Sequence, residues 1–127
     1  MQEKIETITI NNVEYVRKDS VRQSAVNTEG LEFCIVRTRD AGVFAGFLKD
    51  IDKENGVVSC RLTNSIRLWR WSGAASISQL SQEGVKNPND CKFGMVEPEK
   101  EVFGVIEVST CSVKAMKNIQ SVPSWKI

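Results

Sequence analysis

The sequence predicts an α+β domain: a small, SH3-like, strongly twisted β-barrel of about five strands, decorated with two short helices and an N-terminal β-hairpin. Two observations lead to this fold class. Four short apolar runs separated by turn residues lie between positions 31 and 71, a spacing that is typical of a twisted sheet or small barrel. Beyond them, two helix-compatible stretches flank a fifth apolar run at 101–110.

Each expected strand ends at residue types that favour a turn. Ala41 and Gly42 separate the first strand from the second, and Asn55 and Gly56 supply the positive φ angles of a tight hairpin turn. Thr-Asn-Ser at 63–65 is expected to turn between the third strand and the fourth. The five expected strands cover 31–40, 43–52, 57–62, 66–71 and 101–110.

The two expected helices carry start and stop signals. Ser72 is the candidate N-cap of the first helix, which is expected over Ala74–Glu83 with Gly84 as its stop. The second helix is expected within 109–122. Its candidate N-caps are Ser109, Thr110 and Ser112.

The N-terminal segment predicts a separate element. Residues 4–22 alternate like a β-hairpin around a turn at Asn11 and Asn12. Because an isolated two-stranded hairpin is marginally stable in water, it must pack on the body or on another subunit. The polar stretch 22–30 is expected to be a linker, with room for one helical turn. We therefore expect a hairpin and oligomerisation extension at 1–25, a small-barrel domain at 31–127, and a homo-oligomer, either a dimer or larger.

Composition narrows the function classes. The 127 residues carry a formal net charge of +1, which does not favour binding to a long nucleic acid. The charged N-terminus is unlike a signal peptide, and no apolar run is long enough to span a bilayer, so we expect a cytoplasmic protein without a membrane partner. The chain has no histidine, and its four cysteines are not in metal-binding pairs. We therefore expect no catalytic residue, no metal, no cofactor and no enzymatic activity.

The segment Ile66–Trp71 is the first candidate site. Strand alternation places Arg67, Trp69 and Trp71 on one face and the other three residues on the opposite face. Two interpretations stay open. The tryptophans fill the groove between sheet and helix with Arg67 lying over them, or one tryptophan is partly exposed and stacks on a ring of a ligand.

Two further candidates would bind an anion. Gly73 and Ala74 permit close approach to the backbone at the expected start of the first helix, where free N–H groups favour negative charge. Arg37 and Arg39, two residues apart on one strand, present two guanidinium groups to a diphosphate. The structural alternatives are simple helix capping by Ser72 and a solvated strand end.

The loop 86–94 supplies the last candidates. Asn87 and Asn89 are suited to hydrogen bonding with the edge of an adenine, and Lys92 adds positive charge. A polar loop that only turns the chain is the structural alternative. Together the candidates favour a small anionic ligand that carries an aromatic ring.

Two resemblances extend these expectations. The segment ITINNVEYVRKDSV resembles an N-terminal hairpin of many small tailed-phage and prophage proteins. Residues 33–126, with RTRDAGVFAGFL, RLWRWSGAAS, NPNDCKF and VPSWK, resemble a family of such proteins. In size and in its arginine, aromatic and asparagine content, the chain is more loosely similar to phage anti-Thoeris signal-sequestering proteins. That similarity implies a decorated WYL-like fold, a location in the host cytoplasm, and capture of a cyclic ADP-ribose isomer or cyclic oligonucleotide without cleavage.

The preferred function is therefore a phage-encoded sponge for a nucleotide-type immune signal. Three others stay open. A protein–protein inhibitor or adaptor acting on a host enzyme would use the tryptophans as anchors. A nucleic-acid-binding barrel would show steep salt dependence, although the net charge of +1 argues against it. A phosphodiesterase is disfavoured because the sequence has no histidine and no metal-spaced carboxylates.

Overall fold

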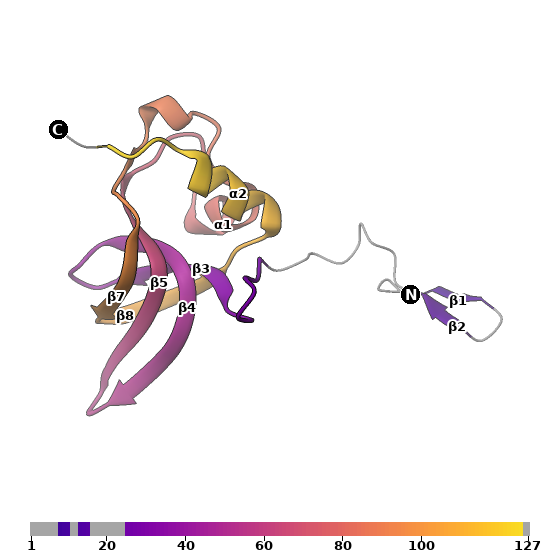
Figure 1. Cartoon of the computed structure of the whole chain (residues 1–127), viewed down its shortest axis with the longest axis horizontal. Helices are drawn as coiled ribbons and strands as arrows, with labels where there is room; N and C mark the ends of the chain where they lie inside the picture. The colour runs from indigo at the N-terminus through magenta and orange to yellow at the C-terminus, as the bar shows by residue number, and fades with distance from the viewer. Residues whose placement is uncertain (1–7, 11–12, 16–24, 126–127) are drawn as a thin grey trace.

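A strongly curved antiparallel sheet forms the body of the protein, and its helices lie together at one end of that sheet (Figure 1). The computed structural model describes residues 8–10, 13–15 and 25–125. The body is small α+β, with a six-stranded sheet in the order β6-β5-β4-β3-β8 and with β7 paired to β5. The elements are β1 (Ile8–Ile10), β2 (Val13–Tyr15), β3 (Glu32–Thr38), β4 (Val43–Glu54), β5 (Val57–Arg70), α1 (Ile77–Glu83), the 3₁₀ turn η2 (Pro88–Asp90), β6 (Lys92–Phe93), β7 (Glu97–Phe103), β8 (Val105–Thr110) and α2 (Val113–Ser121).

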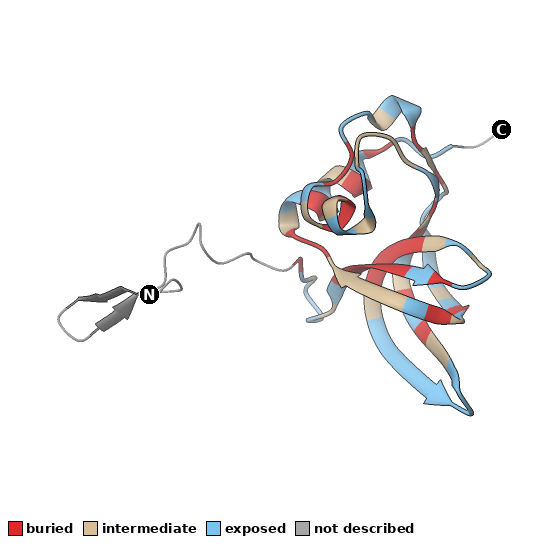
Figure 2. Ribbon diagram, turned by 180° about the vertical axis from the view of Figure 1, so that it is seen from behind, coloured by how far each residue is buried: buried red, intermediate tan, exposed pale blue. Residues whose placement is uncertain are grey.

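The β4–β5 hairpin confirms one expected turn and overturns another. Asn55 and Gly56 have φ angles of 53° and 79°, as the hairpin turn requires. The expected turn at 63–65 is wrong, because β5 runs through it without reversing. Asn64 has a positive φ of 50° there, and the pairing with β4 changes register between Ala45 and Phe47. Such bulges bend a strand while leaving it paired, and the tip of the hairpin projects as an exposed ribbon (Figure 2).

The expected single strand at 101–110 is two strands. Gly104, with φ 75°, lies between β7 and β8 and turns the chain from one partner strand to another. Its N–H donates to Val58 O on β5 at 2.9 Å, and its carbonyl accepts from Arg39 N at 2.9 Å. The corner therefore joins β5 to the turn after β3. Strand pairing shows an open six-stranded sheet rather than a closed barrel, so the fold class is confirmed at the level of α+β.

The helices begin at serine caps. The start expected for the first helix is wrong by several residues, because Ser76 rather than Ser72 caps α1 and accepts from Gln79 N at 3.1 Å. Gly84 ends α1 as expected. For α2, Ser112 is the N-cap and accepts from Ala115 N at 3.0 Å.

Both faces of the sheet bury apolar side chains. Adjacent residues such as Ile35 and Val36 point to opposite faces and belong to different clusters. The helix-side cluster packs the sheet against α1 and α2 and includes Phe33, Ile35, Ala45, Phe47, Ile66, Leu68, Leu80, Phe93, Ala115 and Ile119. The inner cluster on the other face consists of Val36, Phe44, Cys60, Leu62, Val102 and Val105.

Part of the expected linker belongs to the core. Ala25 is fully buried, donates to Cys111 O at 3.1 Å and accepts from Phe33 N at 2.8 Å. Further along, an Asn27 side-chain turn leads into β3. The N-terminal hairpin pairs Ile8 with Tyr15 as expected. The expected turn at residues 11–12 and the first part of the linker lie outside the described residues, and the oligomerisation role of 1–25 stays a prediction.

The buried thiols make the fold sensitive to alkali. Burial raises the pKa of Cys60 to about 11 and that of Cys111 to about 12, from an ordinary value of 9.0. Since both thiols hold their protons more tightly in the folded state, their stabilisation is fully present below pH 9 and is lost as pH rises toward the folded pKa. As pH rises from 8 to 10, each of these thiols ionises in the unfolded chain but not in the folded one. We expect this ionisation to reduce the free energy of unfolding by about 1 kcal/mol per thiol. Urea denaturation at the two pH values measures the change.

The Cys111→Ala variant is the control for this prediction. It is less stable at both pH values because a buried side chain is shortened, but its loss between pH 8 and pH 10 should be smaller by about 1 kcal/mol. Other titrating groups contribute equally to both proteins and cancel in the difference. An identical pH dependence in the variant would contradict the role of Cys111.

Candidate functional site

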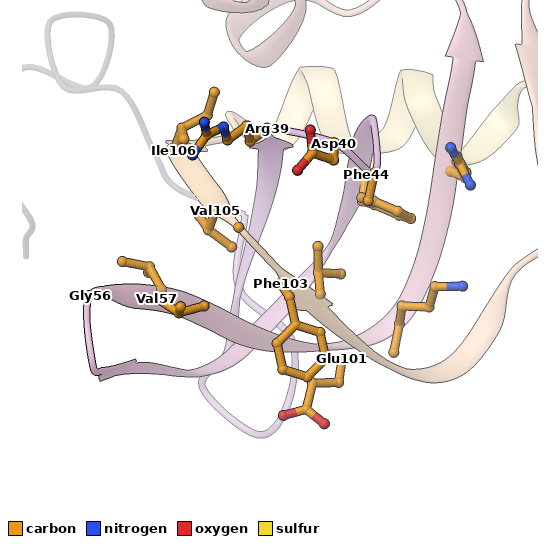
Figure 3. A pocket seen from close by; sticks show the side chains of 15 residues that line it. Arg39, Asp40, Phe44, Gly56, Val57, Glu101, Phe103, Val105 and Ile106 are labelled. Carbon is orange, nitrogen blue, oxygen red and sulfur yellow. The ribbon is translucent and has the colours of Figure 1, made fainter.

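A cavity of about 680 Å³ opens on the sheet face that carries the inner cluster. Its walls come from residues 39–41, 56–58 and 100–106, together with Phe44 and Arg67 (Figure 3). The turn after β3, the β4–β5 hairpin and the Gly104 corner therefore meet around one space. The cavity exists because the bent β5 and the two-strand segment β7–β8 curve around the inner cluster.

Arg67 forms the centre of one wall. It pairs across the sheet with Phe44, and its guanidinium carbon lies 5.5 Å from the centroid of the Phe44 ring and 3.8 Å from that of Trp69. Lys100 Nζ approaches the same Phe44 ring at 5.7 Å. Phe44 is 2% exposed while Trp69 is 56% exposed. Two cations thus meet at a buried ring, and an accessible indole stacks on one of them.

The charges around the cavity are only partly neutralised. Arg39, Arg67 and Lys100 line it together with Asp40 and Glu101. Lys100 Nζ also forms an ion pair with Glu97 at 2.9 Å, outside the cavity lining. Among the described residues, no ion pair joins Arg39 or Arg67 to a carboxylate. Both guanidinium groups are therefore available to an anion in the cavity.

The structure separates the two arginines predicted to act together. β3 ends at Thr38, so Arg39 lies in the turn after the strand, where the alternation that placed both arginines on one face no longer applies. Arg39 lines the cavity. Arg37 lies outside the lining, and its Nε donates to Glu107 Oε1 at 2.8 Å. The expected diphosphate fork of Arg37 and Arg39 is therefore absent.

The two tryptophans also separate. Arg67 and Trp69 share a face opposite the buried Ile66 and Leu68, as alternation predicts. Trp71 instead packs against the helix-side cluster, after a register shift between Leu68 and Arg70. Trp71 packs on the helix-side cluster, as the structural interpretation expected of both tryptophans, while Trp69 is exposed and its stacking on a ligand ring stays a prediction. Neither indole belongs to the residues that line the cavity, although Trp69 contacts Arg67.

The helix start expected beside Gly73 and Ala74 is wrong, so these residues do not have the helix N-terminus on which the expected anion site depended. Both residues precede the helix, and Ala74 packs against the helix-side cluster. Gly73 has φ 93°, and a Cβ there would lie 2.5 Å from Lys86 N. Glycine is needed because two backbone segments approach closely, which leaves no room for a ligand.

The candidates of the loop 86–94 lie away from the cavity lining. Asn87 braces the loop, because its Nδ2 donates to Ser72 Oγ at 3.1 Å. Asn89 is exposed within η2, and Lys92 Nζ lies 4.9 Å from the Trp125 ring. The loop is also more regular than expected, since it contains η2 and the short strand β6.

Most residues that line the cavity were not predicted from the sequence, among them Phe44, Lys100 and Phe103. The hairpin turn at Asn55 does predict a partner for Arg67. Glu54 pairs with Val57 beside the turn, and an uninterrupted register from there places Phe44 opposite Arg67. The two register shifts between these pairs cancel, so the structure has the same pair. No local signal marks Lys100 or Phe103. Their place depends on the long-range pairing of β7 with β5.

Residues 8–10, 13–15 and 25–125 contain neither a candidate metal site nor a helix able to span a membrane. No group of three or more His, Cys, Asp or Glu side chains there is arranged to hold a metal ion. Within the same residues, no helix has the length and apolar character needed to cross a membrane.

Fold and site define a small α+β protein with a cavity of mixed cationic and apolar lining on the inner face of a curved sheet. The chain belongs to the family described as Domain of unknown function (DUF6948), whose profile matches residues 31–119. No curated protein and no solved structure matches it. The family description states no activity, so function must be argued from the cavity.

Proposed function

We propose that this protein binds a small nucleotide-type anion in its cavity and holds it without cleaving it. One observation carries the proposal: Arg67, without a carboxylate partner among the described residues, stacks on the exposed Trp69 and over Phe44 at the cavity wall. A guanidinium in contact with aromatic rings keeps its N–H groups for phosphate oxygens. The exposed indole beside it offers a surface on which a ligand ring stacks.

The size and lining of the cavity support a ligand of this class. Its volume of about 680 Å³ falls within the range of 300–1,000 Å³ that is typical of small-molecule sites. Arg39 and Lys100 add two further cationic groups to the lining. In a ligand with one or two phosphates and a ring, the phosphates would contact the cationic side chains and the ring would contact the apolar ones.

The non-cleaving part of the proposal is supported by the chemistry of the lining. None of the described lining residues is a serine, threonine, tyrosine, cysteine or histidine. The usual pairing of a nucleophile with a neutral base is therefore not available at this wall. Holding the ligand intact is the chemistry that an arginine, lysine and aromatic lining favours.

The biological setting is also a proposal. We propose a phage-encoded protein that sequesters a cyclic ADP-ribose isomer or a cyclic oligonucleotide in the host cytoplasm, as the sequence resemblances imply. An SH3-like or WYL-like barrel belongs to the same proposal. The two Gly104 hydrogen bonds, to Val58 and Arg39, support a sheet that curls toward closure around the cavity. We also propose that the protein forms a homo-oligomer through residues 1–25.

A second candidate function is binding to a host protein. The exposed apolar side chains of Val57, Phe103 and Ile106 favour it, since apolar groups at this level of exposure, 50–58%, form protein interfaces. A protein partner would need a continuous apolar face rather than a cationic cavity. The ligand screen below separates the two functions.

A thermal-shift screen tests the proposal. The purified protein is heated with cyclic ADP-ribose isomers, cyclic di- and trinucleotides, NAD and ADP-ribose. A ligand that binds only the folded state adds about 2.7 kcal/mol at a hundredfold excess over its Kd, which corresponds to roughly 10 °C for a chain of this size. We expect such a shift with a cyclic species that is recovered intact by mass spectrometry. No shift with any of them would favour the protein partner, and a cleaved ligand would contradict the sponge.

A further inference from the structure

A second surface, largely outside the cavity, alternates aromatic rings with cations. Trp69 is 56% exposed, and the Arg67 guanidinium carbon lies 3.8 Å from its ring centroid. Trp125 is 48% exposed, and Lys92 Nζ lies 4.9 Å from its ring centroid. These four residues form the aromatic–cation strip. Of the four, Arg67 also lines the cavity, and the other three lie outside its lining.

Strand pairing brings the two halves of the strip to one face of the sheet. Leu68 on β5 pairs with Phe93 on β6, and both are buried in the helix-side cluster. The residues next to them, Trp69 and Lys92, therefore lie on the opposite face. Lys92 pairs with Arg70, the residue that follows Trp69. The Trp69 and Lys92 positions are thus neighbours across β5 and β6.

The C-terminal tail extends this face by one more chain. Ser124 forms a parallel bridge with Phe93, and Trp125 N–H donates to Phe93 O at 2.8 Å. Alternation places Trp125 on the face opposite Phe93, where Lys92 contacts it. Neighbouring chains of a sheet are about 4.8 Å apart, so the two indoles are separated by about 10 Å with β6 between them.

The cations of the strip are not neutralised, and its surface is open. Among residues 8–10, 13–15 and 25–125, no ion pair joins Arg67 or Lys92 to a carboxylate. Gly94 follows β6 and donates its N–H to Arg67 O at 2.8 Å. A Cβ at Gly94 would lie 3.7 Å from Arg67 Cβ, so the missing side chain leaves the strip uncovered there. Accessible rings that alternate with unpaired cations are complementary to a chain of bases and phosphates.

We infer that the aromatic–cation strip binds a short stretch of single-stranded nucleic acid, with one base on Trp69, another on Trp125 and phosphates at Arg67 and Lys92. Stacked bases rise about 3.4 Å each, so a separation of about 10 Å spans roughly three nucleotides. A net charge of +1 gives no long-range attraction, and the site therefore depends on stacking and on local cations. This site goes beyond the proposed function of the cavity.

Fluorescence anisotropy with labelled octanucleotides, one of thymidylate and one of uridylate, tests the inference in the full-length protein. We expect a single strand to bind, and the tighter of the two identifies the source as DNA or RNA. A duplex of the same length should bind at least tenfold more weakly, because its bases are already stacked and paired. Contact with two phosphates predicts a salt slope of about −1.4, so binding should weaken roughly sevenfold between 50 and 200 mM salt.

Two variants outside the cavity lining probe the strip directly. Trp125→Ala should weaken binding of the single strand by roughly tenfold, because one stacked base loses its partner. Lys92→Gln should weaken binding by roughly five- to tenfold and reduce the salt slope by about 0.7, because one phosphate contact is lost. Lys53→Gln is the matched control, because Lys53 is exposed on β4 near the hairpin tip and lies outside the strip. It should leave the Kd within about twofold of the wild type and the slope unchanged.

The outcomes separate the strip from the cavity. No binding of either single strand at 50 mM salt would overturn the inference and leave the proposed function standing, because cyclic ligands test that function. A duplex bound as tightly as the single strand would overturn it too, since charge alone would then account for binding. The same holds if Trp125→Ala melts normally and binds like the wild type. If that variant unfolds, an unchanged Kd and salt slope in Lys92→Gln would overturn the inference instead. A protein partner that Trp125→Ala no longer binds, with no binding of either strand, would assign the strip to a protein interface.

Discussion

Replacing Arg67 with glutamine will weaken ligand binding by roughly 30- to 100-fold, because hydrogen bonds to charged groups contribute about 1.5–3 kcal/mol each. Glutamine keeps much of the length of the side chain and removes the charge. The guanidinium has its Trp69 and Phe44 contacts, but no carboxylate among the described residues shares it. Isothermal titration with the cyclic species identified by the thermal-shift screen measures the loss.

Arg37→Gln is the matched control. Arg37 lies on β3, its side chain is 48% exposed, and it pairs with Glu107 outside the cavity lining. We expect the Kd of this variant to stay within about twofold of the wild type, because an exposed ion pair contributes little to stability and none to the site. Equal losses of affinity in Arg67→Gln and Arg37→Gln would contradict a specific role of Arg67. The ligand would then be held by the overall positive charge of the surface.

The melting temperature separates binding from folding in the Arg67→Gln variant. Arg67 is partly exposed, and its stacking on Trp69 contributes about 0.5–1 kcal/mol at such a site. The variant should therefore melt within a few degrees of the wild type. A variant that unfolds would make Arg67 an architectural residue, and a variant that is folded and binds normally would move the site away from this wall.

Local patterns in the sequence predicted the parts of the fold that depend on neighbouring residues. The Asn55 and Gly56 turn, the Gly84 stop of α1 and Ser112, one of three candidate caps of α2, each follow from a few adjacent side chains. Alternation over Ile66–Trp69 was also predictable, because the strand is regular over that short span.

The remaining errors come from irregularities that no local pattern announces. Arg39 reaches the cavity from the turn that follows β3, and a register shift near Arg70 sends Trp71 to the helix-side cluster. A one-residue slip moves a side chain to the opposite face of a sheet. Of the ten predicted ligand-binding residues, Arg39 and Arg67 line the cavity and Trp69 contacts one of them. Alternation alone cannot assign a face beyond the first bulge.

The close approach of distant segments explains the other errors. Gly73 was interpreted as space for a ligand, but the backbone at Lys86 fills that space. Lys100 and Phe103 reach the cavity through the pairing of β7 with β5, which is long-range in sequence. Neither residue could be assigned to the cavity from residue type alone, because tertiary structure decides which strands meet there.

Phe33→Ala will produce the largest loss of stability that we predict, about 3–5 kcal/mol in the free energy of unfolding. Phe33 is completely buried in the helix-side cluster, and its ring packs edge-on against Phe47 with centroids 5.1 Å apart. The shortened side chain would leave a cavity between the sheet and the helices that rigid strands cannot close. Since domains of this size are stable by only about 5–15 kcal/mol, the expected fall in melting temperature is roughly 12–20 °C. Thermal and urea denaturation measure it.

Phe103→Ala is the matched comparison, because it makes the same change of side chain on a strand of the same sheet. Phe103 is 58% exposed, so little apolar surface is exposed anew on truncation, and the free energy of unfolding should change by no more than about 0.5 kcal/mol. The two variants together divide the phenylalanines between architecture and binding: Phe33 should affect stability, and Phe103 should affect affinity alone. Equal destabilisation by both would mean that Phe103 is covered in the folded protein in solution, and its side chain would then not be accessible to a ligand in the cavity.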